Sequence, residues 1–181
     1  MSRKYKFHDN DKLYFISFAV VNWIDIFIRE EYKQELIKSW QYCIENKGLQ
    51  IYGWCIMTSH VHMIIGTTGK NLDDIVGEMK SYTSTQFKKI IKDHPQESRK
   101  EWMLWMFEKA GSRNSNIEKR QLWQQHNKPI ELWSAEVIDQ KVNYIHNNPV
   151  EAGFVNEPEH WQYSSAIDYT GEKGIIEIDL I

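Results

Sequence analysis

The sequence predicts an α+β fold, in which helices pack on one face of an antiparallel, ferredoxin-like sheet. A strand-like segment at 12–20 is followed by a helical pattern at 30–48, two strand-like segments at 49–57 and 60–68, and a long helical pattern at 71–94. The order β-α-β-β-α is typical of that sheet. With 181 residues, the chain has the length of one domain with a single core.

The first half of the chain justifies these elements one by one. The segment at 12–20 is rich in β-branched and aromatic residues, which favour a strand. In the segment at 30–48, apolar side chains recur at helical spacing at Leu36, Ile37, Trp40 and Ile44. Gly48 follows them as a helix stop. A short turn around Thr58 and Ser59 predicts that the next two strands form an antiparallel hairpin.

The second half contains more helix and one short strand. The helix at 71–94 begins with Asn71 as its cap, and a further helix is predicted over 97–111 with Gly111 as C-cap. Segment 112–121 is interpreted as a loop, and 122–133 as containing a short strand. The last helix starts after Ser134 and is expected to end before Pro149, which places Asn148 in extended backbone.

Composition narrows the class of protein. The apolar run at 13–21 is too short to span a bilayer, so we expect a cytoplasmic protein with no membrane partner. Cys43 and Cys55 form no zinc-type pattern, and we expect two free, buried thiols. The net charge is -3, but residues 80–120 carry ten Lys and Arg against five Asp and Glu, whereas residues 130–181 are strongly acidic. This asymmetry allows one positive face on an acidic protein.

Two histidines stand out in the segment CIMTSHVHMIIG, residues 55–66. On a strand, alternate side chains share a face, so His60 and His62 project together and Val61 projects to the opposite side. Neutral imidazole is a common ligand of divalent metals, but a site needs a third ligand, usually an oxygen donor for Mg²⁺ or Mn²⁺. The alternative interpretation is two polar residues on one side of a strand.

A second group of polar residues lies in VNYIHNNPVEAGFV, residues 142–155. Ile138, Val142 and Ile145 form one apolar stripe of a helix, and Tyr144 and Asn148 are an i,i+4 pair beside it. A phenol and an amide in this position are able to reach into a cleft. The alternative interpretation is that Tyr144 is a half-buried aromatic residue and that Asn148 ends the helix. His146 is expected to be exposed.

Together these segments resemble the single-tyrosine HUH transposases, which are IS200-like, and most closely the branch associated with repetitive extragenic palindromes (REP). The resemblance rests on SHVHMII, YIHNNPVEAGFV, LWQQHNKPIEL before the last helix and EPEHWQYSSAIDY after it, and spans most of residues 50–169. It implies one HUH endonuclease domain of ferredoxin-like fold over 1–181, with 149–181 as a C-terminal extension.

The resemblance also implies roles for single residues. His60 and His62 would bind Mg²⁺ or Mn²⁺ with Asn148 as third ligand, where the insertion-sequence branch has glutamine. Tyr144 would attack a single-stranded DNA phosphodiester and leave a 5′-phosphotyrosine and a free 3′-OH. A tyrosine with the reference pKa of about 10 is mostly protonated at neutral pH, so a metal that offsets charge on the phosphate would assist it.

DNA contacts are expected from the basic centre. The candidates for phosphate binding are Lys80, Lys88, Lys89, Lys92, Arg113 and Arg120. Tyr82, Trp102 and Trp105 are candidates for stacking on unpaired bases, although the two tryptophans also fit core spacing on their helix. The role of His126 is left open.

The sequence therefore predicts a metal-dependent endonuclease and strand transferase acting on single-stranded DNA near hairpins. The alternatives are a DNA- or RNA-hairpin-binding protein that no longer cleaves, and a hydrolytic nuclease in which Tyr144 is structural. A monomer is favoured over a homodimer, because the palindrome-associated branch is expected to act as a monomer and 149–181 would cover the dimerisation surface.

Overall fold

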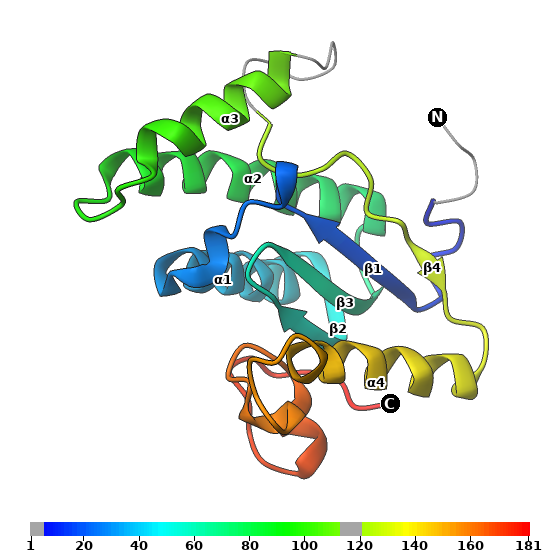
Figure 1. The fold of residues 1–181 in the computed structure, drawn as a ribbon. Helices are drawn as coiled ribbons and strands as arrows, with labels where there is room; N and C mark the ends of the chain where they lie inside the picture. Colours follow the sequence, from blue (N-terminus) through cyan, green and yellow to red (C-terminus); the bar gives the residue numbers. More distant parts are fainter. Residues whose placement is uncertain (1–5, 113–120) are drawn as a thin grey trace.

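The computed structural model describes residues 6–112 and 121–181, which form one antiparallel sheet with helices on both of its faces (Figure 1). The strands and α-helices, in chain order, are β1 (Tyr14–Ala19), α1 (Glu30–Lys47), β2 (Leu49–Ile56), β3 (His60–Thr67), α2 (Leu72–Asp93), α3 (Lys100–Ser112), β4 (Ile130–Glu131) and α4 (Ala135–Glu151). Short 3₁₀ helices are η1 (Val21–Trp23), η2 (Ile26–Ile28), η3 (Pro158–His160) and η4 (Ala166–Thr170).

The strand order is β2-β3-β1-β4, with all neighbours antiparallel. With the connections β1-α1-β2-β3-α2-β4, this is the arrangement of a ferredoxin-like sheet, so the predicted α+β fold is confirmed. β3 lies in the centre, with His60 opposite Ala19 and His62 opposite Ser17 of β1. The β2–β3 hairpin and the short strand before α4 also agree with the prediction.

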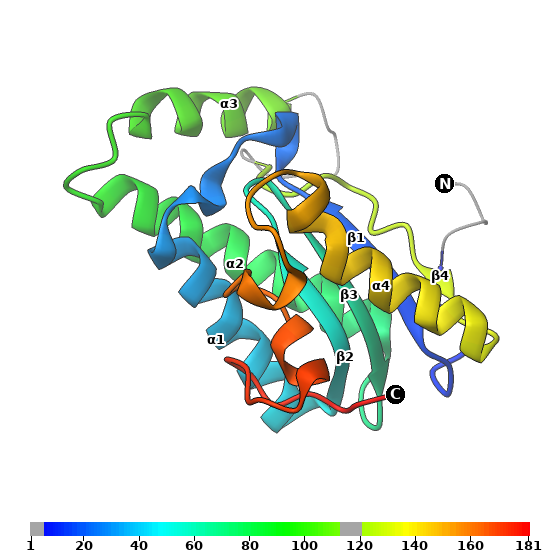
Figure 2. The ribbon, with the colours of Figure 1, turned by 60° about the horizontal axis from the view of Figure 1, so that its bottom comes forward.

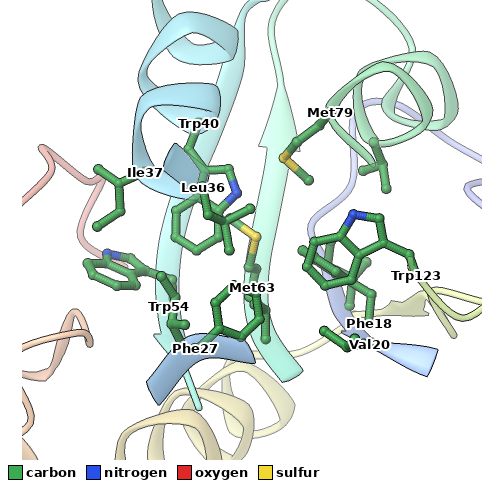
Figure 3. Packing of buried hydrophobic residues seen from close by; sticks show 14 of the residues in the cluster. Phe18, Val20, Phe27, Leu36, Ile37, Trp40, Trp54, Met63, Met79 and Trp123 are labelled. Atoms are coloured by element: carbon green, nitrogen blue, oxygen red, sulfur yellow. The ribbon is translucent and has the colours of Figure 1, made fainter. Parts of the chain in front are cut away.

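Alternation along the strands divides the core between the two faces. Val61, Met63 and Ile65 of β3 belong to the larger cluster, which packs with Trp40 of α1 and Met79 of α2 (Figure 3). The opposite face carries a smaller cluster that includes Phe15, Ile64 and Ile145 of α4. Helices α1 and α2 thus share one face as expected, whereas α4 lies over the other face, the one that bears the histidines (Figure 2).

Two predicted helix ends differ from the structure. Gly111 lies within α3 instead of capping it, and α4 continues through Pro149 to Glu151. The proline removes one backbone donor near the end of the helix, and the last turn is closed by hydrogen bonds from Ala152 to Asn148 and from Phe154 to Pro149. Asn148 is therefore helical, not extended. The caps predicted at Gly48, in the left-handed region with φ 75°, and at Ser134 are confirmed.

The segment after α4 covers the exposed edge of the sheet, as Figure 2 shows beside β2. Backbone hydrogen bonds join Ile56 N to Tyr163 O, Ser165 N to Trp54 O and Asp179 N to Ile51 O. An edge strand that is paired in this way no longer presents free donors and acceptors to another chain.

An ion cluster around the buried Glu97 carboxylate connects η2 to the turn between α2 and α3. Glu97 is 4% exposed and accepts from Arg29 Nε at 2.8 Å and from Arg99 Nε at 3.3 Å, and Arg99 also pairs with Asp25. Burial raises the pKa of the Glu97 carboxyl, but its hydrogen bonds and the arginines outweigh burial and lower that pKa. This cluster holds the start of α3 against the rest of the domain.

Cys43 and Cys55 are free and buried, as predicted. In the described part of the chain, no helix has the length and apolarity needed to cross a bilayer.

Candidate active site

His60 and His62 lie side by side on the α4 face of β3, with ring centroids 4.8 Å apart. His62 is 5% exposed, and Phe15 of β1 stacks on its ring at 5.6 Å. Burial, together with the nearby His60 and Lys141, lowers the pKa of His62 to about 3. The ring is therefore neutral at physiological pH, which is the form that binds metal.

The nitrogens of His62 show how a metal ion would fit here. Both Nδ1 and Nε2 are buried and have no hydrogen-bond partner in the protein. A buried polar atom without a partner is costly, and such atoms in a native structure point to a ligand, an ion or water. A divalent cation would give one of these nitrogens a partner, so the residues present fit a metal.

Asn148 and His60 complete the candidate ligand set. An interaction with the Asn148 side chain partly offsets the lowering of the His60 pKa by burial, so the two side chains lie close to each other. Among residues 6–112 and 121–181, no three His, Cys, Asp or Glu side chains gather in a metal-binding group. His60, His62 and Asn148 do not form such a group, because the third member is an amide that would bind through its oxygen.

Tyr144 occupies the position next to these ligands. Its ring centroid is 5.2 Å from that of His62 and 5.9 Å from that of Phe15, and the side chain is 41% exposed. Since Asn148 follows one helical turn later, α4 presents both side chains to the histidine face of β3. A phenol that is open to solvent on one side and close to the His62 imidazole on the other is accessible to a large substrate.

Lys141 is a site residue that the sequence reasoning missed. Its Nζ lies 4.9 Å from the ring centroid of Phe15 and 5.5 Å from that of Tyr144. The available signal was its spacing, because residues i and i+3 of a helix are neighbours on its surface. Lys141 brings a positive charge to the phenol and to any phosphate that binds there.

His146 was expected to be exposed, and this prediction is wrong. It is 7% exposed, Nε2 is 2.9 Å from Ser165 Oγ, and its ring contacts that of Tyr169. The segment after α4 folds back over this side of the helix, a contact that helical periodicity alone does not reveal. Burial lowers the pKa of His146 to about 4.

The predicted nucleic-acid residues fall into different environments. Lys80 Nζ donates to Gln124 O at 2.8 Å and to Asn127 Oδ1 at 2.6 Å, and burial lowers its pKa to about 8. These bonds explain Lys80 as an anchor for the segment before β4. Lys88 is half-buried, Lys89 and Lys92 are exposed on α2, and Arg113 and Arg120 lie outside the described residues.

The predicted stacking residues are on the surface. Tyr82, Trp102 and Trp105 are each about half exposed, so the core interpretation of the two tryptophans is wrong. Met103 and Phe107 supply the buried positions of α3 instead. His126 is exposed in the segment before β4.

Comparison with known proteins places these features in a family. The family model described as "Transposase IS200 like" matches residues 17–108, just over half of the chain, which includes both histidines but not Tyr144. No curated protein sequence matches the chain. Among solved structures, "Structure of the REP associates tyrosine transposase bound to a REP hairpin" is similar, with a TM-score of 0.68 and 16% sequence identity over 100% of this chain and 92% of that chain. At that identity the similarity shows a shared fold, and the match of the family model shows that the chain belongs to the IS200-like transposase family.

Proposed function

We propose that this protein is a metal-dependent endonuclease and strand transferase that acts on single-stranded DNA beside hairpins, with Tyr144 as its nucleophile. The observation that carries the proposal is the meeting of Tyr144 with His62, and of Asn148 with His60, within one chain. Membership of a transposase family and a fold shared with a hairpin-bound relative support DNA hairpins as the substrate.

The metal would be held by His60, His62 and Asn148. Two imidazoles and an amide would bind Mn²⁺ or Mg²⁺ less tightly than carboxylates would. They leave coordination positions free for substrate oxygens and water. A bound divalent cation supplies Lewis-acid stabilisation of charge on the scissile phosphate. Phe15 stacks on His62 and keeps the inner side of the site apolar.

The protein's own part in the reaction is the attack of a phenol on phosphorus. Tyr144 Oη forms the new P–O bond and gives up its proton, the bond from phosphorus to the 3′ oxygen breaks, and that oxygen takes a proton to become the 3′-OH. The product is a 5′-phosphotyrosine, which conserves the phosphodiester for a later attack by another 3′-OH. Lys141, at 5.5 Å from the Tyr144 ring, favours the phenolate as it develops.

The proximity of all these residues in one chain supports action in cis. We therefore propose a monomer in which residues 1–181 act as one domain. The extension at 149–181 supports this state, because its backbone pairs with β2 at the edge where a second sheet would otherwise add. Light scattering over a range of concentrations tests it, and a stable dimer would contradict it.

The decisive experiment incubates the protein with Mn²⁺ and a hairpin oligonucleotide carrying single-stranded arms and a label 3′ of the cleavage site. The wild type should form a covalent protein–DNA adduct that survives denaturing electrophoresis. Tyr144→Phe, His60→Ala and His62→Ala should not form it, whereas Tyr42→Phe, which changes an exposed tyrosine on α1, should leave it unchanged.

Other outcomes select the alternatives. Hairpin binding without any adduct would favour a non-cleaving hairpin-binding protein. Cleavage without a protein-linked intermediate, unaffected by Tyr144→Phe, would indicate hydrolysis by a metal-bound nucleophile.

A further inference from the structure

Trp23 is an exposed aromatic residue at the edge of the candidate active site. Its side chain is 60% exposed, although its neighbours Val21 and Ile24 are buried at 6% and 4%. It lies in η1, shortly after β1, and its ring makes an edge-to-face contact with the His60 ring, with centroids 5.4 Å apart. A large apolar ring is thus presented to solvent next to a proposed metal ligand.

The backbone around Trp23 is held in an unusual conformation. Asn22 and Trp23 both have positive φ, at 56° and 55°, a region that non-glycine residues seldom adopt. The turn is fixed on either side, because Val20 N before it donates to Ser59 O at 2.9 Å and Phe27 N after it donates to Thr58 O at 2.9 Å. Strain of this kind persists where the surrounding structure enforces it, and it is concentrated at functional sites.

The conformation has a geometric consequence. The bond from Val20 to Ser59 ties the start of the turn to the residue that precedes His60, so the position of Trp23 is coupled to that of the histidine pair. The indole is therefore fixed beside the place where the proposed function puts the scissile phosphate. A rigid aromatic face beside that phosphate is suited to bind an unpaired nucleobase, because every kind of base can stack on an aromatic side chain.

We infer that Trp23 is a stacking platform for one unpaired nucleobase adjacent to the scissile phosphate. The inference rests on the proposed function for the identity of the substrate as single-stranded DNA. It adds a substrate-binding residue to that function, and it requires no contact between Trp23 and the reacting atoms.

The test measures binding without metal, so that its readout does not depend on cleavage. Fluorescence anisotropy follows a fluorescein-labelled hairpin oligonucleotide with single-stranded arms in buffer containing EDTA. Replacing the indole in Trp23→Ala should weaken binding about 5- to 150-fold, the range expected for the loss of one stacked base. Trp23→Phe should recover much of the affinity, because it restores an aromatic face.

A matched control and a change in the DNA make the test specific. Trp133→Ala removes another exposed tryptophan, 76% exposed, which precedes the N-cap of α4, whereas Tyr144 lies more than two turns into that helix. It should leave the affinity unchanged. A scan of single abasic nucleotides along the arms should find one position at which wild-type affinity falls, and the same abasic DNA should bind Trp23→Ala no more weakly than intact DNA does.

The outcomes separate this inference from the proposed function. If the wild type binds DNA through Trp23 but forms no Tyr144 adduct with Mn²⁺, the proposed function fails and the stacking platform stands. If the adduct forms but Trp23→Ala binds intact DNA as tightly as the wild type does, the stacking inference is overturned. It is also overturned if each abasic substitution weakens binding by Trp23→Ala as much as it weakens binding by the wild type. It is equally overturned if the wild type does not bind, or if Trp23→Ala instead abolishes a dimer seen by light scattering, which would assign Trp23 to a subunit contact.

Discussion

Removing the charge of Lys141 should slow formation of the tyrosine adduct without preventing it. Lys141 Nζ lies 5.5 Å from the Tyr144 ring centroid, and the charge develops on the phenol oxygen of that ring. Two unit charges separated by about this length interact by about 3 kcal/mol at an effective dielectric of 20 and by less than about 1 kcal/mol in water. Tyr144 is 41% exposed and its charge develops only in part, so the contribution should lie between these limits. About 1–2 kcal/mol corresponds to a rate about 5- to 30-fold lower.

The assay is the single-turnover rate of adduct formation at saturating hairpin DNA and saturating Mn²⁺. It is run at pH 8, so that any change in the protonation of His62, whose pKa Lys141 helps to lower, does not contribute. Lys141→Met removes the charge and keeps the apolar stem, whereas Lys141→Arg keeps the charge. We expect the methionine variant to be slow and the arginine variant to lie close to the wild type. Equal rates for Lys141→Met and the wild type, or equal losses for both variants, would refute an electrostatic role for this lysine.

Three further predictions concern His146 in α4, the buried carboxylate of Glu97, and Asn148, the proposed third metal ligand. The folded-state pKa of His146 is about 4, below its ordinary value of 6.5, so the unfolded chain takes up the proton first and stability is lost as pH falls from about 6.5 towards 4. In urea unfolding, this residue should account for about 2 kcal/mol of the loss between pH 7 and pH 5, and His146→Gln should show a correspondingly weaker pH dependence. Glu97→Ala leaves Arg29 without its carboxylate partner and Arg99 with Asp25 alone, and it should lower the free energy of unfolding by about 3 kcal/mol. Glu78→Ala, which removes an exposed carboxylate paired with Lys70, should change the free energy of unfolding much less. Asn148→Ala should raise the Mn²⁺ concentration for half-maximal adduct formation about tenfold or more, and an unchanged metal titration would exclude Asn148 as a ligand.

The parts of the site that the sequence predicted are those that depend on local periodicity. Strand alternation placed His60 and His62 on one face, and an i,i+4 spacing placed Tyr144 and Asn148 on one side of a helix. Neither periodicity predicts that β3 and α4 face each other. We inferred this arrangement from the resemblance to a family. The structure shows this juxtaposition, with the Tyr144 ring 5.2 Å from that of His62.

The environments that the sequence did not reveal are those supplied by distant segments. His146 is buried by Ser165 and Tyr169, residues from the segment after α4, and Lys80 is bound by carbonyl and amide oxygens from the segment before β4. A helical pattern identifies the side of α4 that packs on the sheet, but the returning chain covers a second side. Trp23 is a residue that the sequence pattern did not single out, because its exposure beside the buried Val21 and Ile24 occurs in a turn with left-handed backbone.

The continuation of α4 through Pro149 bears directly on the third metal ligand. Had the helix ended before the proline, Asn148 would have had extended backbone and its side chain would no longer have followed Tyr144 by one turn. Pro149 is itself buried, and Asn148 O accepts from Ala152 N, so the helical position of Asn148 is secured on its C-terminal side. Proline leaves Ile145 O without its helical donor, but it fixes its own φ and so restricts the backbone of the last turn. A stiff final turn lets an asparagine, whose side chain is shorter than that of glutamine, keep its amide within reach of His60. Pro149→Ala should therefore leave the helix intact but loosen this position, and its effect should appear in the metal titration before it appears in stability.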